Sequence, residues 1–165
     1  MPPDPDQNPS DLQHALGKVP SGLFVLSIGH DERAFGMLVS WVQQAGFDPP
    51  ALTVALRLDR PIVDRATRAG AFTLSQIPEG GKSLLRHFAR GTTGDESLFR
   101  GIATLPVPDS VGLVPAGSLA FLDLQITGHV DSGDHRILMA TITQGAILDP
   151  NAAPMVHIRK SAHHY

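Results

Sequence analysis

Apolar residues in this chain recur mostly at every second position, which is typical of β-strands that bury one face. The N-terminal part is the exception. Residues 1–9 are rich in Pro, Asp and Asn and predict a flexible tail, so that 10–165 form the folded domain. Ser10-Asp11-Leu12-Gln13 matches a capping box, which predicts a short helix from there to Leu16 with Gly17 at its C-terminal end.

Seven segments have the composition and alternation expected of strands. They are residues 23–28, 33–39, 51–57, 71–77, 119–127, 137–143 and 155–159. The polar residues 40–50 are expected to form a loop that ends at Pro49-Pro50. Turns are expected at 29–32 and 131–134. Because strands mostly follow strands, the pattern favours a mainly β fold, an antiparallel barrel with a few short helices, over alternating βαβ units.

Two further helices are expected between the strands. The first begins after Asp59 as N-cap and ends at Gly70, and the second covers 82–90. The apolar residues expected to face inward are Ile62, Val63, Ala66 and Ala69 in the first helix, and Leu84, Leu85 and Phe88 in the second. Residues 91–118 are rich in Gly, Pro and Ser and are expected to form a long surface excursion.

The composition excludes several classes of protein. The chain has 165 residues, typical of one domain, and no Cys, which excludes disulfides and thiol nucleophiles and suits a reducing cytoplasm. A net charge of −3 without a basic stripe argues against nucleic-acid binding. The N-terminus lacks the features of a signal peptide, and the apolar runs are too short to cross a membrane. We therefore expect a cytoplasmic protein with no membrane partner.

The sequence offers little of the usual catalytic machinery. Gly81-Lys82-Ser83 looks like the end of a phosphate-binding P-loop, but Gln76 stands where that motif needs its leading Gly. The eight His residues show no helical spacing of a zinc enzyme, so no metal site is expected. Three acidic residues with catalytic potential are expected to be solvated instead: Asp123, Asp131 and Asp134.

Six short segments, each weak alone, stand in an informative order. They are residues 15–22, 36–50, 70–76, 84–89, 133–135 and 157–165. The second contains Ser40-Trp41 followed by Asp48-Pro49-Pro50, and the fifth reads Gly133-Asp134-His135. Together they resemble the flavin reductase family, whose fold is an FMN-binding split barrel. The last segment is similar to the tail of the flavin reductase modules in diflavin flavodiiron proteins.

The resemblance implies an NAD(P)H:flavin oxidoreductase that binds FMN, or FAD, and passes hydride from NADH or NADPH to flavin N5. In such a protein the flavin carries the reaction, while the protein binds, orients and tunes it. The family also implies a homodimer, and a partner monooxygenase or another electron acceptor. Two alternatives stay open: a flavin-bound electron carrier without nicotinamide activity, and a split-barrel module for heme or another cofactor.

The resemblance also implies site residues. Contacts to the flavin ring are expected from Leu38, Val39, Ser40, Trp41, Val42 and Gln43. Contacts to the ribityl chain and phosphate are expected from Arg57, Asp59 and Arg60, where the family often has Asn, Ser and Thr, with Ser75, Gln76 and Lys82 as further candidates. His135 is expected as the catalytic residue beside flavin or nicotinamide, and Tyr165 as a cover. Plain surface charges at Arg57 and Arg60, and a solvated turn histidine at His135, are the alternatives.

Overall fold

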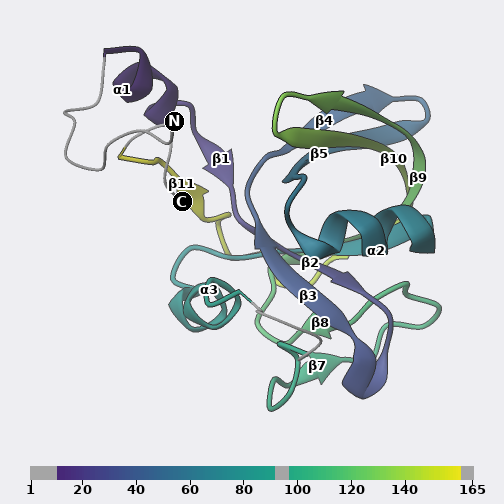
Figure 1. Cartoon of the computed structure of the whole chain (residues 1–165). Coiled ribbons are helices and arrows are strands. Elements are labelled where there is room, and N and C mark those ends of the chain that lie inside the picture. The colour runs from purple at the N-terminus through teal and green to yellow at the C-terminus, as the bar shows by residue number, and fades with distance from the viewer. Residues whose placement is uncertain (1–10, 92–96, 161–165) are drawn as a thin grey trace.

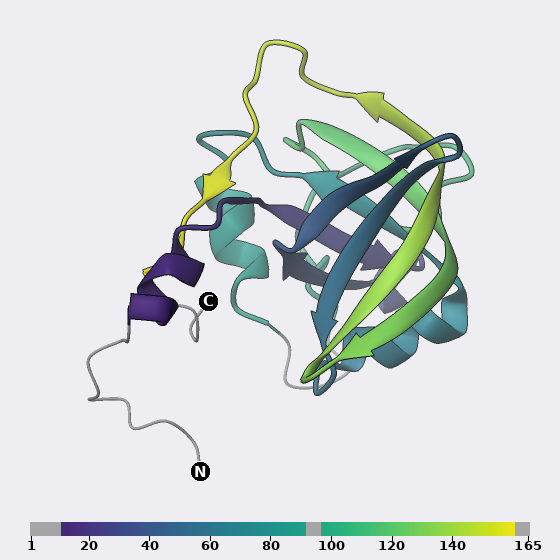
Figure 2. The same cartoon turned by 90° about the horizontal axis from the view of Figure 1, so that it is seen from above.

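The fold is built on one antiparallel seven-stranded sheet, seen in a computed structural model that describes residues 11–91 and 97–160 (Figure 1). In spatial order its strands are β3 Phe35–Val39, β2 Phe24–Ile28, β6 Ala71–Gln76, β9 Ala120–Ser132, β10 His135–Ile147, β5 Pro50–Arg57 and β4 Val42–Phe47. The sheet curls strongly (Figure 2). No ladder joins the edge strands β3 and β4 in the described chain, so the barrel stays open there. The expected fold class, mainly antiparallel β with short helices, is confirmed.

The main hydrophobic core lies inside the curl. On β6, Phe72 and Leu74 point inward and are almost completely buried. Helix α2, Pro61–Ala69, packs against them through Ile62, Val63 and Ala66. The remaining core residues are Leu26, Phe35, Val39, Leu52, Val54, Leu56, Leu124, Leu138 and Ala140.

The boundaries of α2 differ slightly from the expectation. Arg60, not Asp59, is the N-cap, and it makes no side-chain capping hydrogen bond. Pro61 occupies the first helical position, where its missing N–H costs nothing. Gly70 ends the helix with a φ of +70°, a left-handed conformation that favours glycine. Ala69 is exposed, so its expected inward orientation is wrong.

A second hydrophobic cluster covers the outer side of β2 and β6. Helix α3, Lys82–Phe88, is shorter than the expected 82–90 and packs there through Leu84 and Phe88, with Leu85 partly buried. The other buried members are Leu23, Val25, Ala34, Ile77 and Phe99. The expected excursion at 91–118 contains a short hairpin, in which β7 Thr104–Leu105 pairs with β8 Val114–Pro115. Elsewhere in the chain, a 3-10 turn, η1 Asp31–Arg33, precedes β3.

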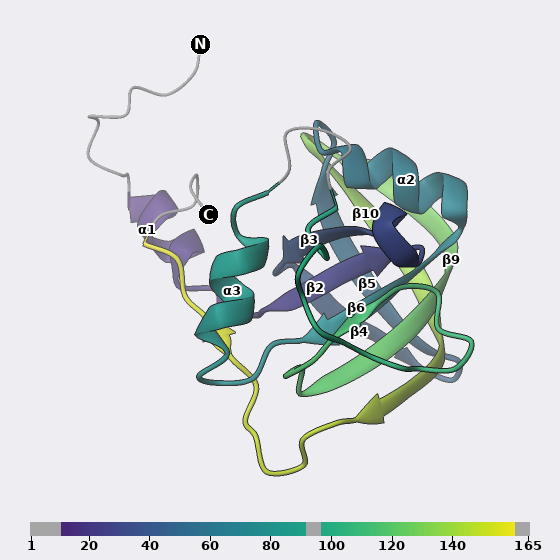
Figure 3. The same ribbon diagram turned by 90° about the horizontal axis from the view of Figure 1, so that it is seen from below.

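The two ends of the described chain, residues 11–22 and 156–160, form a separate feature that we call the terminal arm. It contains helix α1 Asp11–Gly17, β1 Ser21–Gly22 and β11 Val156–His157. Strands β1 and β11 pair antiparallel, and the arm stands beside the barrel (Figures 1 and 3). The segment before β11 runs along the one after β6, where the Met155 N–H donates to the Ile77 carbonyl over 3.0 Å. Strand β11 is shorter than the expected 155–159 and lies outside the seven-stranded sheet.

Two expectations about the sheet need correction. Strand β4 replaces most of the loop expected at 40–50 and pairs with β5 through the turn at Asp48-Pro49. Strands β9 and β10 are longer than the expected 119–127 and 137–143, since each has 13 residues. They meet at the two-residue turn Gly133-Asp134, which is shorter than the expected turn at 131–134. Gly133 has a φ of +60°, which suits the first residue of such a turn.

Asp123 is buried, so the solvated role expected for it is wrong. Its side chain lies on β9, on the side away from the main core, and the residue is only 1% exposed. Its Oδ1 accepts hydrogen bonds from the hydroxyls of Thr73 and Ser110, and its Oδ2 accepts one from Gln144 Nε2 over 2.6 Å. Asp131 and Asp134, in contrast, are exposed as expected.

Candidate functional site

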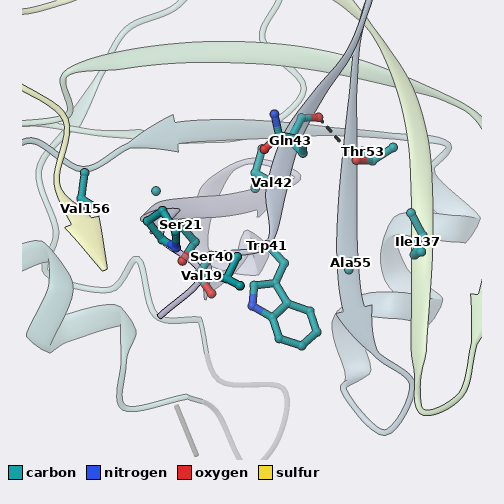
Figure 4. A pocket seen from close by; sticks show the side chains of 12 residues that line it. Val19, Ser21, Ser40, Trp41, Val42, Gln43, Thr53, Ala55, Ile137 and Val156 are labelled. Carbon is teal, nitrogen blue, oxygen red and sulfur yellow. Dashed lines mark hydrogen bonds between the residues drawn. The ribbon is translucent and has the colours of Figure 1, made fainter. Parts of the chain in front are cut away.

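A pocket of about 460 Å³ lies between the terminal arm and the outer face of β4, β5 and β10 (Figure 4). The strand period creates its sheet wall. Because Val54 and Leu138 point into the core, their neighbours Ala55 and Ile137, which are cross-strand partners, point outward into the pocket. The lining residues are Val19, Pro20, Ser21, Gly22, Ser40, Trp41, Val42, Gln43, Thr53, Ala55, Ile137 and Val156. Among the described residues, the lining contains no charged side chain and is mostly apolar.

Ser40 and Trp41 lie where the chain passes from β3 to β4. The Ala55 N–H donates to the Trp41 carbonyl over 2.9 Å, and the Val42 N–H donates to the Ser40 carbonyl over 3.0 Å, which fixes the backbone. Ser40 is 6% exposed, and its Oγ has no hydrogen-bond partner in the described part of the chain. A buried hydroxyl without a partner costs free energy, so a ligand that pairs with it gains affinity.

His135 stacks on the ring of Trp41, with ring centroids 4.6 Å apart and an interplanar angle of 30°. Its Nδ1 lies 2.6 Å from Asp134 Oδ1, and because a carboxylate only accepts, Nδ1 carries the proton. This contact holds the pKa of Asp134 below its usual value. The other nitrogen, Nε2, is buried without a partner among the described residues and accepts a hydrogen bond when the ring is neutral.

Arg57 lies beside His135 on the same outer face, because the two are cross-strand partners. It stands two residues beyond Ala55, about 7 Å further along the strand. The guanidinium of Arg57 makes a two-pronged contact with Asp59, and Arg60 Nε lies 3.9 Å from the same carboxylate. The hydrogen bond from Arg57 is the main reason that the pKa of Asp59 is lowered.

Of the expected residues within the described chain, only Ser40, Trp41, Val42 and Gln43 line the pocket; His135, Arg57, Asp59 and Arg60 do not, and neither do the rest. The side chain of Leu38 packs against the second cluster, and Val39 belongs to the core, so both offer only backbone groups near the pocket. Ser75 pairs with Val25 and faces the second cluster instead. Gln76 is half-buried at the end of β6, and Lys82 is exposed at the start of α3. Tyr165 lies outside the described residues.

Sequence reasoning assigned no role to one wall of the pocket. Residues 19–22 and Val156 come from the terminal arm, and Arg159 follows β11 with its guanidinium carbon 5.0 Å from the Trp41 ring centroid. Residues 15–22 and 157–165 contributed to the resemblance, but among them only Tyr165 was given a role in the site. On the sheet wall, the alternation in 51–57 was a usable signal for the outward direction of Thr53 and Ala55.

Within the described residues, no group of three or more His, Cys, Asp or Glu is placed to hold a metal ion. The helices of residues 11–91 and 97–160 are also too short or too polar to cross a membrane.

Comparison with known proteins identifies the family. Residues 16–165 match the family model of the flavin reductase like domain. The chain belongs to this family, as the sequence motifs indicated. It is 31% identical over 157 residues to a putative diflavin flavoprotein A 6 of Nostoc sp. strain PCC 7120, covering 94% of this chain and 27% of that protein. It is 32% identical over 162 residues to a putative diflavin flavoprotein A 3 of Synechocystis sp. strain PCC 6803, covering 98% and 27%. The chain thus spans about a quarter of these relatives.

Solved structures share the fold of this flavin reductase-like domain. The NADH:FAD oxidoreductase SgcE6 of Streptomyces globisporus superposes with a TM-score of 0.80 at 24% identity, covering 95% of each chain. A structure of the same protein in complex with NAD and FAD fragments has a TM-score of 0.78 at 23% identity, covering 87% of this chain and 84% of that chain. The styrene monooxygenase flavin reductase of Pseudomonas putida S12 has a TM-score of 0.74 at 21% identity, covering 90% and 93%.

Proposed function

We propose that this domain is an NAD(P)H-dependent flavin reductase whose flavin, FMN or FAD, binds in the pocket beside Ser40 and Trp41. The observation that carries the proposal is the Ser40 hydroxyl, which is buried at a mostly apolar pocket and has no hydrogen-bond partner among residues 11–91 and 97–160. A flat ring with polar edges needs apolar walls and a few hydrogen-bonding groups. When bound, the flavin supplies the hydride-accepting chemistry.

Each wall has a role in this proposal. The Ser40 hydroxyl and the main chain of 40–43 bind the polar edge of the flavin ring, with the Gln43 side chain beside them. Trp41, Ile137 and Val156 exclude water from its faces. Arg57 and Arg60 bind the phosphate of the flavin, which replaces the Asp59 carboxylate as their partner. A guanidinium suits this task because its fork binds two oxygens at once.

His135 is the proposed polar group beside the reacting rings. Asp134 holds its proton on Nδ1 and thereby fixes the tautomer, and the stack on Trp41 fixes the plane of the ring. The buried Nε2 is left to accept a hydrogen bond from flavin or nicotinamide. Its role is to orient the ligand, since hydride transfer to a flavin needs no nucleophile from the protein.

We further propose that two copies associate through the terminal arm. Several of its apolar side chains are largely exposed: Leu12, Leu16, Val19, Val156 and Ile158. Exposed apolar patches of this kind often mark interaction surfaces. Because Val19 and Val156 also line the pocket, a second copy there stands next to the flavin. Light scattering after gel filtration measures the mass, and a monomer at micromolar concentration contradicts this part of the proposal.

A second candidate function is a flavin-bound electron carrier. It is favoured by the chain's match to about a quarter of the length of proteins named diflavin flavoproteins, since such a segment can pass electrons to another part of a longer protein.

For the reductase, the proposed electron acceptor is a partner monooxygenase or a similar protein, and the proposed location is the cytoplasm.

One anaerobic titration tests these proposals. The protein is incubated with FMN or FAD, and the free flavin is removed. NADH or NADPH is then added while absorbance is followed at about 450 nm, where oxidised flavin absorbs. Rapid bleaching by one nicotinamide supports the reductase. Bleaching by dithionite alone supports the carrier, and no binding of either flavin refutes both.

A further inference from the structure

Arg159 connects the two walls of the pocket. Its own segment belongs to the arm, where its backbone N–H donates to the Gly17 carbonyl over 3.1 Å. Its Nη2 lies 3.5 Å from the Leu16 carbonyl, a long contact at the end of α1. Its guanidinium carbon lies 5.0 Å from the centroid of the Trp41 ring, which belongs to the sheet wall.

We propose that Arg159 is a positioning residue that fixes the Trp41 indole in the pocket wall and thereby sets how tightly a flat aromatic ligand is held. This inference rests on the proposed function for its ligand, a flavin. The backbone of Trp41 is held by the hydrogen bond from Ala55, but that bond does not fix the ring. The ring itself contacts His135 on the sheet side and Arg159 on the arm side.

The expected effect follows from the strength of such contacts. A cation over an aromatic face contributes a modest free energy that increases as the pair is removed from water, and Arg159 is half-buried. If the loss of this contact leaves the indole mobile, the ligand must order it on binding, which costs a similar amount. We therefore expect about three- to tenfold weaker flavin binding without the guanidinium.

The chain offers two good tools for the test. Trp41 is its only tryptophan, so fluorescence excited at wavelengths that tyrosine does not absorb reports on this site alone. Lys160, the next residue, is an exposed cation and serves as the matched control. Arg159→Met removes the charge but keeps much of the side-chain length, Arg159→Lys keeps the charge, and Lys160→Met changes the same net charge one position away.

The experiment measures acrylamide quenching of Trp41 in the ligand-free proteins and FMN affinity by calorimetry. Arg159→Met should increase quenching and weaken FMN about three- to tenfold, Arg159→Lys should restore part of both, and Lys160→Met should match the wild type. Urea midpoints identify any variant whose folding has changed. Equal quenching and equal affinity for Arg159→Met and Lys160→Met would overturn the proposal.

A double-mutant cycle separates positioning from a general role in holding the arm. In a Trp41→Leu background, Arg159→Met should no longer affect FMN affinity, because its partner ring is gone. If the loss persists there, Arg159 acts on the arm alone and the proposal is wrong. If the wild type binds no flavin at all, the proposed function fails, while the quenching comparison still decides the Arg159–Trp41 contact.

Discussion

Replacing Ser40 with alanine should change stability and binding in opposite directions. The Ser40 Oγ is buried and has no hydrogen-bond partner in the described part of the chain, a state that costs about 1–3 kcal/mol for a polar group. Alanine removes this oxygen and leaves only a small gap. We expect the ligand-free Ser40→Ala protein to gain about 1 kcal/mol in the free energy of unfolding, which raises the melting temperature by about 2–4 °C for a domain of this size.

The same substitution should weaken the flavin complex. If the Ser40 hydroxyl pairs with a polar edge of the ring, the variant loses one hydrogen bond with a net worth of about 0.5–1.5 kcal/mol. This corresponds to about two- to tenfold weaker binding. The ligand-free protein is therefore less stable than the alanine variant, because the hydroxyl that pairs with the ligand has no hydrogen bond until the ligand binds.

Ser75 supplies a matched control. Its Oγ is also buried and unpartnered among the described residues, and the residue is 0% exposed. It lies on the side of β6 that faces the second hydrophobic cluster, not the pocket. Ser75→Ala should therefore gain stability like Ser40→Ala without any change in flavin affinity.

Thermal unfolding of the ligand-free variants and calorimetric titration with FMN and FAD measure both effects. The reasoning is refuted if Ser40→Ala lowers the melting temperature, or if it binds flavin as tightly as the wild type. It is also refuted if Ser75→Ala weakens binding as much as Ser40→Ala, since the effect would then not come from the pocket.

Three further substitutions test the rest of the structure. Asp123→Ala removes the acceptor of three hydrogen bonds, and we expect a loss of about 2–4 kcal/mol in urea unfolding; a change below about 0.5 kcal/mol would contradict the role of this cluster. Phe72→Ala opens a cavity in the barrel core and should cost about 3–5 kcal/mol in the same assay. The hydrogen bond from Arg136 lowers the pKa of Asp131 in the folded state. The ion pair therefore stabilises the fold at pH values above the unfolded-state pKa of about 3.9. This stabilisation is lost as the pH falls through the folded-state pKa. The melting temperature of Asp131→Asn should accordingly lie below that of the wild type at pH 7, and the two should be equal at about pH 2.

The sequence predicted those strands whose two faces differ. Residues 23–28, 51–57 and 71–77 were each placed within one residue of β2, β5 and β6, because one face of each packs into the core. The sequence did not predict strand β4. It is an edge strand whose exposed Gln43 and Gln44 give no alternation, and it exists because β5 supplies its backbone partners.

Asp123 shows what alternation cannot predict. The pattern correctly separated Asp123 from the core-facing Leu122 and Leu124, but it equated the side away from the core with solvent. A segment from the excursion covers that side, where Ser110 reaches Asp123 and Ser27 donates to the Leu113 carbonyl over 2.7 Å. Burial of this face depends on where a distant loop lies, which a local period does not contain.

The candidate site divides in the same way. The resemblance pointed to Ser40, Trp41, Val42 and Gln43 because one continuous segment carries them, and the structure brings all four to one pocket. The opposite wall is made by β1 and β11 from the two ends of the described chain, and Arg159 contacts a carbonyl 143 residues away. Neither end has a periodic pattern that marks it as a binding wall. The pocket is therefore a tertiary feature: one wall follows from a local motif, whereas the other exists only after the terminal arm has assembled beside the barrel.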